Sequence, residues 1–246
     1  MEEHQAPHRT SRARGDCRLV PRNPAPMSLV RRETLPALLA LRPVPPPPPQ
    51  ARSAILWGDA SVARIAARTA AAAVDRGVAV AIIDGAMAFD VSAIAAYAQA
   101  RRVSPEHFLQ HIYIARAFTC HQMATLLCER LDPLVAAQQV GIVILLGPCT
   151  TFFDENVPFK DAFLLFQRLL GQVAALCAGG PLLLAAQALD SYRTRRTLFM
   201  RELLKAVELG IRVSATEGRR DVQLIKPRCP SQSKVSPTMQ CSDSRR

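Results

Sequence analysis

A broken phosphate-binding pattern follows the first apolar run of the chain. Residues 58–65 read GDASVARI, which overlays G-x-x-x-x-G-K-[ST] with Ala63, Arg64 and Ile65 at the second glycine, the lysine and the hydroxyl residue. In the intact pattern the lysine reaches the β- and γ-phosphates, and the hydroxyl binds Mg²⁺. Arg64 keeps a positive charge, but its planar guanidinium does not replace a compact ammonium, and an isoleucine cannot ligate a metal. The pattern therefore predicts a phosphate-binding turn that has lost its chemistry.

Alternating strand and helix patterns surround this turn. An apolar run at 54–57 precedes Gly58, and an alanine-rich helical segment follows Val62. Buried strands are predicted at 78–85, 111–117, 140–147 and 181–187, and helices at 91–102, 121–138, 159–178 and 191–208, with a kink or break at Asp132-Pro133. Continuous apolar strands that alternate with helices favour a doubly wound, mainly parallel α/β sheet with helices on both faces.

The last part of the predicted domain has a different pattern. Residues 211–218 and 219–227 are typical of two antiparallel strands, and Glu217-Gly218 supplies turn residues between them. We therefore expect a C-terminal β-hairpin at the end of the α/β domain.

Proline and charge divide the chain into three parts. Residues 1–52 hold eleven of the nineteen prolines and nine Arg against four Asp/Glu. We expect them to form a disordered segment with one short Leu-rich helix near 34–42, which either packs back on the core or docks on a neighbouring subunit. Residues 53–227 are predicted to form the folded domain, and residues 228–246 a disordered basic tail.

The net charge of +11 lies mainly in the two ends of the chain. Basic ends either attract nucleic acid non-specifically or serve as solubilising tails. The seven cysteines form no C-x-x-C and lack zinc-finger spacing, so we expect reduced, mostly buried thiols and no metal site. No uninterrupted apolar run approaches the roughly 18 residues of a membrane span, and no secretory signal is evident. We expect a cytoplasmic protein without a membrane partner.

Residues 111–127, HIYIARAFTCHQMATLL, carry a more specific pattern. They resemble the segment of the RecA/RadA-type recombinase family in which a strand ends in A-R-A-[FY] and a helix begins near H-Q. Here residues 115–118 read ARAF and residues 121–122 read HQ, with a loop one residue shorter. The order of the predicted elements over 53–227 also agrees. The resemblance implies a RecA-like, P-loop-type fold.

The same resemblance implies a vestigial nucleotide site at Gly58, Arg64, Asp84 and Gln187. Gln187 is similar to the family's γ-phosphate-sensing glutamine, and Asp84 keeps one member of a strand-end acidic pair. The water-activating glutamate falls on Ala86, and the aspartate that supports magnesium falls on Gly147. Single groups of this kind contribute roughly 10³–10⁵ in rate, so we assign no catalytic residue and expect no cofactor. Binding of ATP and Mg²⁺ without turnover stays open as an alternative.

Nucleic-acid contacts are implied in the loops after two strands. Phe152 and Phe153 would stack on single-stranded DNA, or else anchor their loop on the core, and the neighbouring Asp154-Glu155 disfavours phosphate. The densest basic cluster of the domain follows residues 181–187, and it is either a phosphate-contact surface or a solvated helix face. Its arginines are Arg193, Arg195, Arg196 and Arg201.

These patterns together predict a non-catalytic, recombinase-like accessory factor in DNA repair or recombination. Its partner would be a protein, such as a recombinase or a polymerase accessory protein. Two alternatives stay open. One is a divergent ATP-binding protein or weak ATPase of the same family, and the other is a single-stranded nucleic-acid-binding module that uses the basic ends and the cluster at 192–201.

Overall fold

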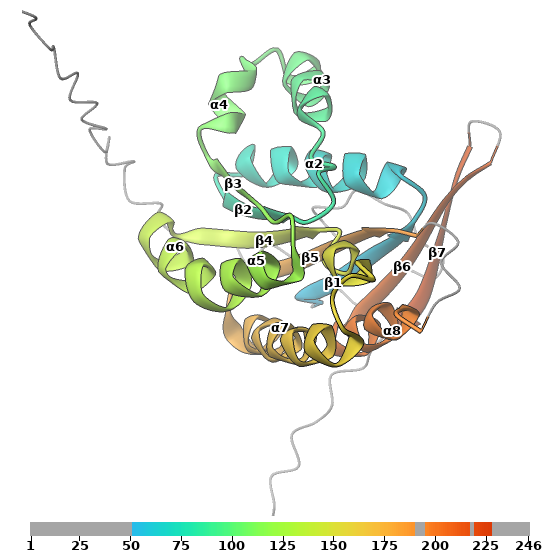
Figure 1. Cartoon of the computed structure of the whole chain (residues 1–246). Coiled ribbons are helices and arrows are strands. Elements are labelled where there is room, and N and C mark those ends of the chain that lie inside the picture. Colours follow the sequence, from blue (N-terminus) through green and yellow to red (C-terminus); the bar gives the residue numbers. More distant parts are fainter. Residues whose placement is uncertain (1–50, 190–194, 217–218, 228–246) are drawn as a thin grey trace, which may run out of the picture.

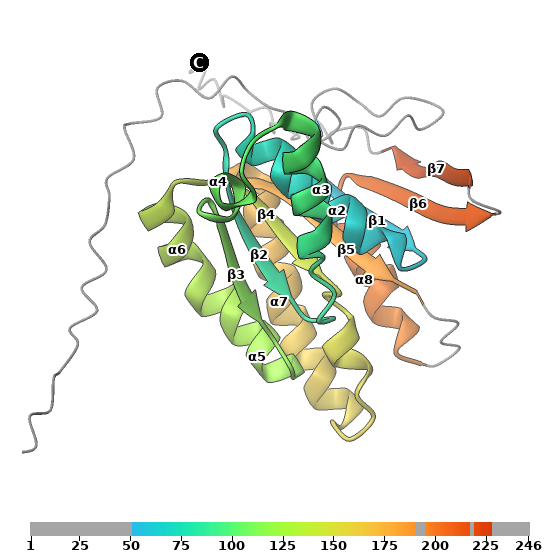
Figure 2. The same cartoon turned by 90° about the horizontal axis from the view of Figure 1, so that it is seen from above.

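A seven-stranded sheet runs through the molecule, and helices cover both of its faces (Figures 1 and 2). The computed structural model describes residues 51–189, 195–216 and 219–227. The strand order is β3-β2-β4-β5-β1-β6-β7, and every neighbouring pair is parallel except β6 and β7, which pair antiparallel. The predicted doubly wound, mainly parallel α/β class is confirmed.

The strands form where the chain is continuously apolar. All six residues of β2 are buried, as are six of the seven residues of β5, because helices cover both faces of these central strands. The bounds of the strands are β1 Ser53–Gly58, β2 Ala79–Asp84, β3 Ile112–Arg116, β4 Val140–Leu146, β5 Leu182–Ala188, β6 Leu209–Thr216 and β7 Arg219–Pro227.

The helices divide between the two faces of the sheet (Figure 1). One face carries α2 Ser61–Val74, α3 Val91–Arg101 and α4 Pro105–Leu109. The other carries α5 Cys120–Thr125, the π-helical turn η1 Leu126–Arg130, α6 Leu131–Gln138, the 3₁₀ turn η2 Thr150–Phe153, α7 Phe159–Gly179 and α8 Thr197–Ala206.

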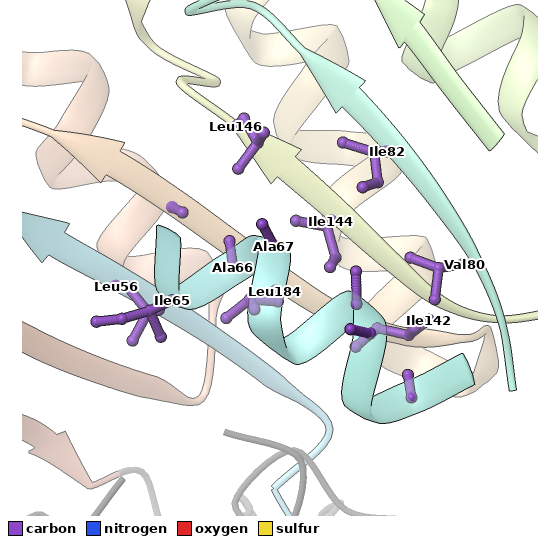
Figure 3. Packing of buried hydrophobic residues seen from close by; sticks show 14 of the residues in the cluster. Leu56, Ile65, Ala66, Ala67, Val80, Ile82, Ile142, Ile144, Leu146 and Leu184 are labelled. Carbon is purple, nitrogen blue, oxygen red and sulfur yellow. The ribbon is translucent and has the colours of Figure 1, made fainter. Parts of the chain in front are cut away.

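Alanines bring α2 close to the sheet. Ala66 and Ala67 are buried, and Figure 3 shows them above strand side chains that include Leu184 and Ile144. Short side chains allow a helix to lie near a sheet without a void, so this layer is filled from the strands by Leu and Ile. The packing fixes where α2 begins, directly after β1.

Helix α7 covers the opposite face. Among the described residues it is the helix that is long and apolar enough to cross a membrane by length and composition alone. Its stripe of Phe166, Leu169, Val173 and Leu176 is buried against the sheet. The spacing of that stripe is that of an amphipathic helix with one face in the core.

Three elements differ from the sequence predictions. Helix α2 begins at Ser61 rather than after Val62, and α8 begins at Thr197 rather than at 191. Helix α4 was not predicted, and Pro105 occupies its first turn, where a missing N–H costs nothing. The helix predicted at 121–138 does lose its regular α-helical form near Pro133, as a π turn at Leu126–Arg130, and Pro133 has no N–H to donate to the preceding turn. The predicted Leu-rich helix at 34–42, the disordered ends and the hairpin turn at 217–218 lie outside the described residues.

Candidate functional site at the carboxyl edge of the sheet

Gly58 ends β1 against the backbone of β6. Its φ is +148°, and a Cβ placed on it would lie 1.7 Å from the carbonyl oxygen of Val213. The backbone N–H of Leu189 donates to the Gly58 carbonyl at 2.8 Å. The contact between three strand ends therefore requires a glycine here, whether or not a ligand binds.

The turn after Gly58 is closed by its own aspartate. Only Asp59 and Ala60 separate β1 from α2. The backbone N–H of Ser61 donates to Asp59 Oδ1 at 2.7 Å, and the N–H of Val62 donates to the Asp59 carbonyl at 3.2 Å. A carboxylate thus occupies the helix N-terminus, where a phosphate would bind, and the residues of the expected loop are already helical.

Arg64 and Ile65 point away from this turn. The Arg64 Nε donates to Asp90 Oδ2 at 3.3 Å, and the arginine side chain is 58% exposed. Ile65 is buried in the core between α2 and the sheet. Asp90 also accepts a hydrogen bond from the Ser92 hydroxyl, and these two contacts hold the pKa of its carboxyl below the ordinary value. Arg64 therefore joins α2 to the start of α3 and does not join the strand ends.

Asp84 orders the loop after β2. Its side chain is fully buried, and Oδ1 accepts the backbone N–H groups of Ala86 at 3.2 Å and Ala88 at 3.1 Å. Oδ2 accepts the N–H of Phe89 at 3.0 Å. A carboxylate with three amide donors is satisfied by its own loop, so Asp84 holds backbone rather than a metal.

Gln187 is bound in the same way at the end of β5. Its Oε1 accepts the N–H of Cys149 at 2.9 Å, and its Nε2 donates to the Ala188 carbonyl at 2.9 Å and to Thr150 Oγ1 at 3.2 Å. The side chain is buried. Gln187 therefore ties the turn after β4 to β5, and its amide is committed to protein atoms.

Gly147 and Ala86, at the positions of the two missing acidic groups, lie close together. Gly147 follows β4 with a φ of +58°, and a Cβ on it would lie 2.4 Å from the Cβ of Ala86 and 2.6 Å from Thr150 Oγ1. An aspartate at 147 does not fit without movement of both neighbours. Ala86 and Gly147 supply no carboxylate to these turns, and the carboxylate of Asp84 is bound by its own loop, so the residues present do not fit Mg²⁺-ATP.

Little else at this edge offers ligand chemistry. The Ser61 hydroxyl is buried with no hydrogen-bond partner among the described residues, but one neutral hydroxyl does not hold a triphosphate. Burial raises the pKa of the Cys149 thiol far above its ordinary value, which leaves it unreactive. Within residues 51–189, 195–216 and 219–227, no three His, Cys, Asp or Glu side chains are grouped to hold a metal.

The predicted base-stacking residues lie in or on the core. Phe152 is fully buried, with its ring centroid 5.0 Å from that of Phe166 and 5.6 Å from that of Phe199. Phe153 packs against the same cluster and is partly buried. Phe152 is therefore unavailable to a nucleic acid and serves as the anchor of its loop, the second of the two roles that the sequence left open.

The basic cluster splits into separate structural roles. Arg196 is buried, and its guanidinium donates to the carbonyls of Phe152 at 2.6 Å and Val157 at 2.5 Å, so it is a clamp and offers nothing to phosphate. Arg195 lies over the Phe159 ring at 4.3 Å. Arg201 is exposed and faces Glu202 at 3.6 Å. Arg193 lies outside the described residues.

The structure thus brings Gly58, Asp84 and Gln187 to one edge and leaves Arg64 outside it. Sequence reasoning missed Asp59, although aspartates commonly accept the backbone N–H two residues further on in turns. It also missed the Ala86–Gly147 contact, which depends on two turns sixty residues apart meeting in space. Comparison with protein-family models and with curated proteins finds no match for the chain. The resemblance of residues 111–127 to recombinases therefore stays a prediction.

Proposed function

We propose that this protein is a non-catalytic, RecA-like protein-interaction factor that acts in DNA repair or recombination. The RecA-like part is supported by ARAF and HQ at 115–118 and 121–122, and by the meeting of Gly58, Asp84, Gly147 and Gln187 at one edge of the sheet. The non-catalytic part is carried by one observation, which is that the Asp59 carboxylate accepts the N–H of Ser61, the first residue of α2, where a phosphate would bind.

An exposed sheet edge supports a protein partner. Among the described strands none pairs with the outer side of β3, and Ile114 on it is 41% exposed. Phe118, directly after this strand, is 67% exposed. An unpaired edge with apolar side chains is suited to receive a strand from another chain. The occupant in this proposal is a segment of a recombinase-type partner.

A nucleotide experiment tests the non-catalytic part. Thermal unfolding of the full chain is followed with and without ATP and Mg²⁺, alongside phosphate release. A nucleotide that binds only the folded state raises the midpoint temperature of unfolding. At a nucleotide concentration a hundredfold above Kd, the free energy of unfolding rises by about 2.7 kcal/mol. The proposal expects no shift and no phosphate. A saturable shift supports the divergent ATP-binding alternative instead.

A pull-down tests the interaction part. The full chain, a variant lacking residues 34–42 and Ile114→Lys are each mixed with purified recombinases encoded in the same genome. We expect the full chain to retain a recombinase and both changes to weaken retention. Leu164→Lys is the matched control, because Leu164 is also exposed but lies on α7, away from the β3 edge. This variant should behave as the full chain does. Retention that none of these changes alters would exclude this mode of binding.

A further inference from the structure

A groove runs between α2 and α3, on the face of the sheet opposite α7. Figures 1 and 2 show the two helices side by side. The groove measures about 600 Å³, and its α3 wall extends from Ser92 to Arg101, about 14 Å at 1.5 Å per residue. Ala93, Ala96 and Ala100 lie on that wall, and Ala96 and Ala100 are exposed. Three small residues along one helix face leave room for a third helix to approach closely.

Every charged side chain that lines the groove is cationic. Arg64 and Arg68 lie one helical turn apart on α2, and Arg101 lies at the far end of α3. Arg64 pairs with Asp90 and Arg101 pairs with Asp75, which leaves Arg68 without an ion pair among the described residues. Three guanidinium groups against these two carboxylates leave a net positive charge at the groove, and its central cation, Arg68, is free to take a carboxylate.

The groove favours a peptide over a nucleic acid. Its one aromatic side chain, Tyr97, donates its hydroxyl to Asp75 Oδ2 at 3.2 Å and packs edge-on against Phe108 at 5.6 Å between ring centroids. Its ring is thus held by the protein and does not offer a stacking platform for bases. A narrow alanine wall beside an unpaired arginine suits a helix that carries small apolar side chains and a carboxylate.

We propose that the α2–α3 groove binds an acidic amphipathic helix of a protein partner. The small apolar side chains of that helix pack on Ala93, Ala96 and Ala100, and a carboxylate on it pairs with Arg68. The inference rests on the proposed protein-interaction function, but it uses a surface separate from the β3 edge. An experiment can therefore exclude binding at the β3 edge without excluding binding at the α2–α3 groove, and the reverse.

Fluorescence anisotropy tests the groove directly. The probe is a labelled, helix-forming peptide of about 18 residues, with Glu at i and i+4 on one face and Ala and Leu beside it. One comparison probe is the same peptide with Lys in place of Glu, and the other is a labelled (dT)20. We expect the full chain to bind the acidic peptide, more weakly as salt rises, and not the basic one. No binding of the acidic peptide overturns the proposal.

Matched variants assign the binding to the groove. Arg68→Glu and, independently, Ala96→Glu should each weaken peptide binding about tenfold. Arg130→Glu and Ala137→Glu make the same changes at exposed sites on the opposite face and should leave the affinity within about twofold. The proposal is overturned if the groove variants and the control variants weaken peptide binding equally. It is also overturned if the chain binds (dT)20 and Arg68→Glu abolishes that binding, since the groove would then serve nucleic acid. Circular dichroism checks that each variant is folded.

Discussion

Buried polar side chains at the carboxyl edge hold the turns that follow the strands. Asp84 takes three backbone N–H groups, Gln187 bridges two strand ends, and Arg196 binds two carbonyls of the loop at 152–157. Each is a residue type that nucleotide or nucleic-acid sites use, and each is satisfied within the protein. Their removal is therefore expected to affect stability, because partner groups would be left buried and unpaired.

Gln187→Ala measures this at one residue. Without the amide oxygen the Cys149 N–H loses its acceptor, and we expect the free energy of unfolding to fall by about 1–3 kcal/mol. Gln172→Ala is the control, because its amide bonds to Asp132 on the surface, and a change within about 0.5 kcal/mol is expected. Urea unfolding followed by circular dichroism compares the two. A Gln187→Ala protein as stable as the parent would show that the amide is not structural.

Asp90 gives the fold a pH dependence. Its pKa is lowered by the Ser92 hydroxyl and Arg64, so the stability it contributes is present above the ordinary carboxyl pKa and is lost as the pH falls through the folded value. The stability difference between the parent and Asp90→Asn should be constant above about pH 5 and shrink below about pH 4.

Urea unfolding at several pH values tests this. Ser92→Ala removes the hydroxyl that donates to Asp90 at 2.5 Å and should weaken the pH dependence. A difference between the parent and Asp90→Asn that stays the same from pH 7 to pH 3 would contradict the role given to this carboxylate.

At the scale of elements, the junction of β1 and α2 is fixed by strand packing. Gly58 touches the β6 backbone, and α2 begins three residues later. A longer loop, as a phosphate cradle needs, would have to unwind the first turn of α2 and expose Val62, which is buried in the core. The burial of this turn explains why the loop is short.

A pair of glycine variants tests the junction. Gly58→Ala should lower the free energy of unfolding by more than about 3 kcal/mol, because its Cβ would lie 1.7 Å from the Val213 carbonyl oxygen. Gly171→Ala lies within α7 with nothing within 4 Å of its Cβ and should raise stability by about 0.5–1 kcal/mol. Differential scanning calorimetry reports both. A tolerated Gly58→Ala would mean that the strands can separate there.

At the scale of the whole molecule, the strands of the sheet could be predicted from the sequence. The contacts that fill the turns at their carboxyl ends could not. The strands are continuous apolar runs, and β2, β4 and β5 are recognisable without knowledge of their neighbours. The start of α2 depends on how Asp59 folds back, and the role of Arg196 depends on carbonyls about forty residues away. Local patterns carry no information about such contacts, which explains why Phe152 and Arg196 looked available and are buried.

In the whole molecule, a mainly parallel α/β sheet carries at the start of α2 an aspartate that accepts the first N–H of the helix, where an anion would bind. Isothermal titration of Mg²⁺-ATP into the full chain tests this most directly, with Arg64→Lys as a second sample because it restores the ammonium at an exposed position. We expect no heat of binding from either protein, because the Asp59 carboxylate still accepts the first N–H of α2. Saturable binding by the full chain with a Kd below about 100 μM would contradict it.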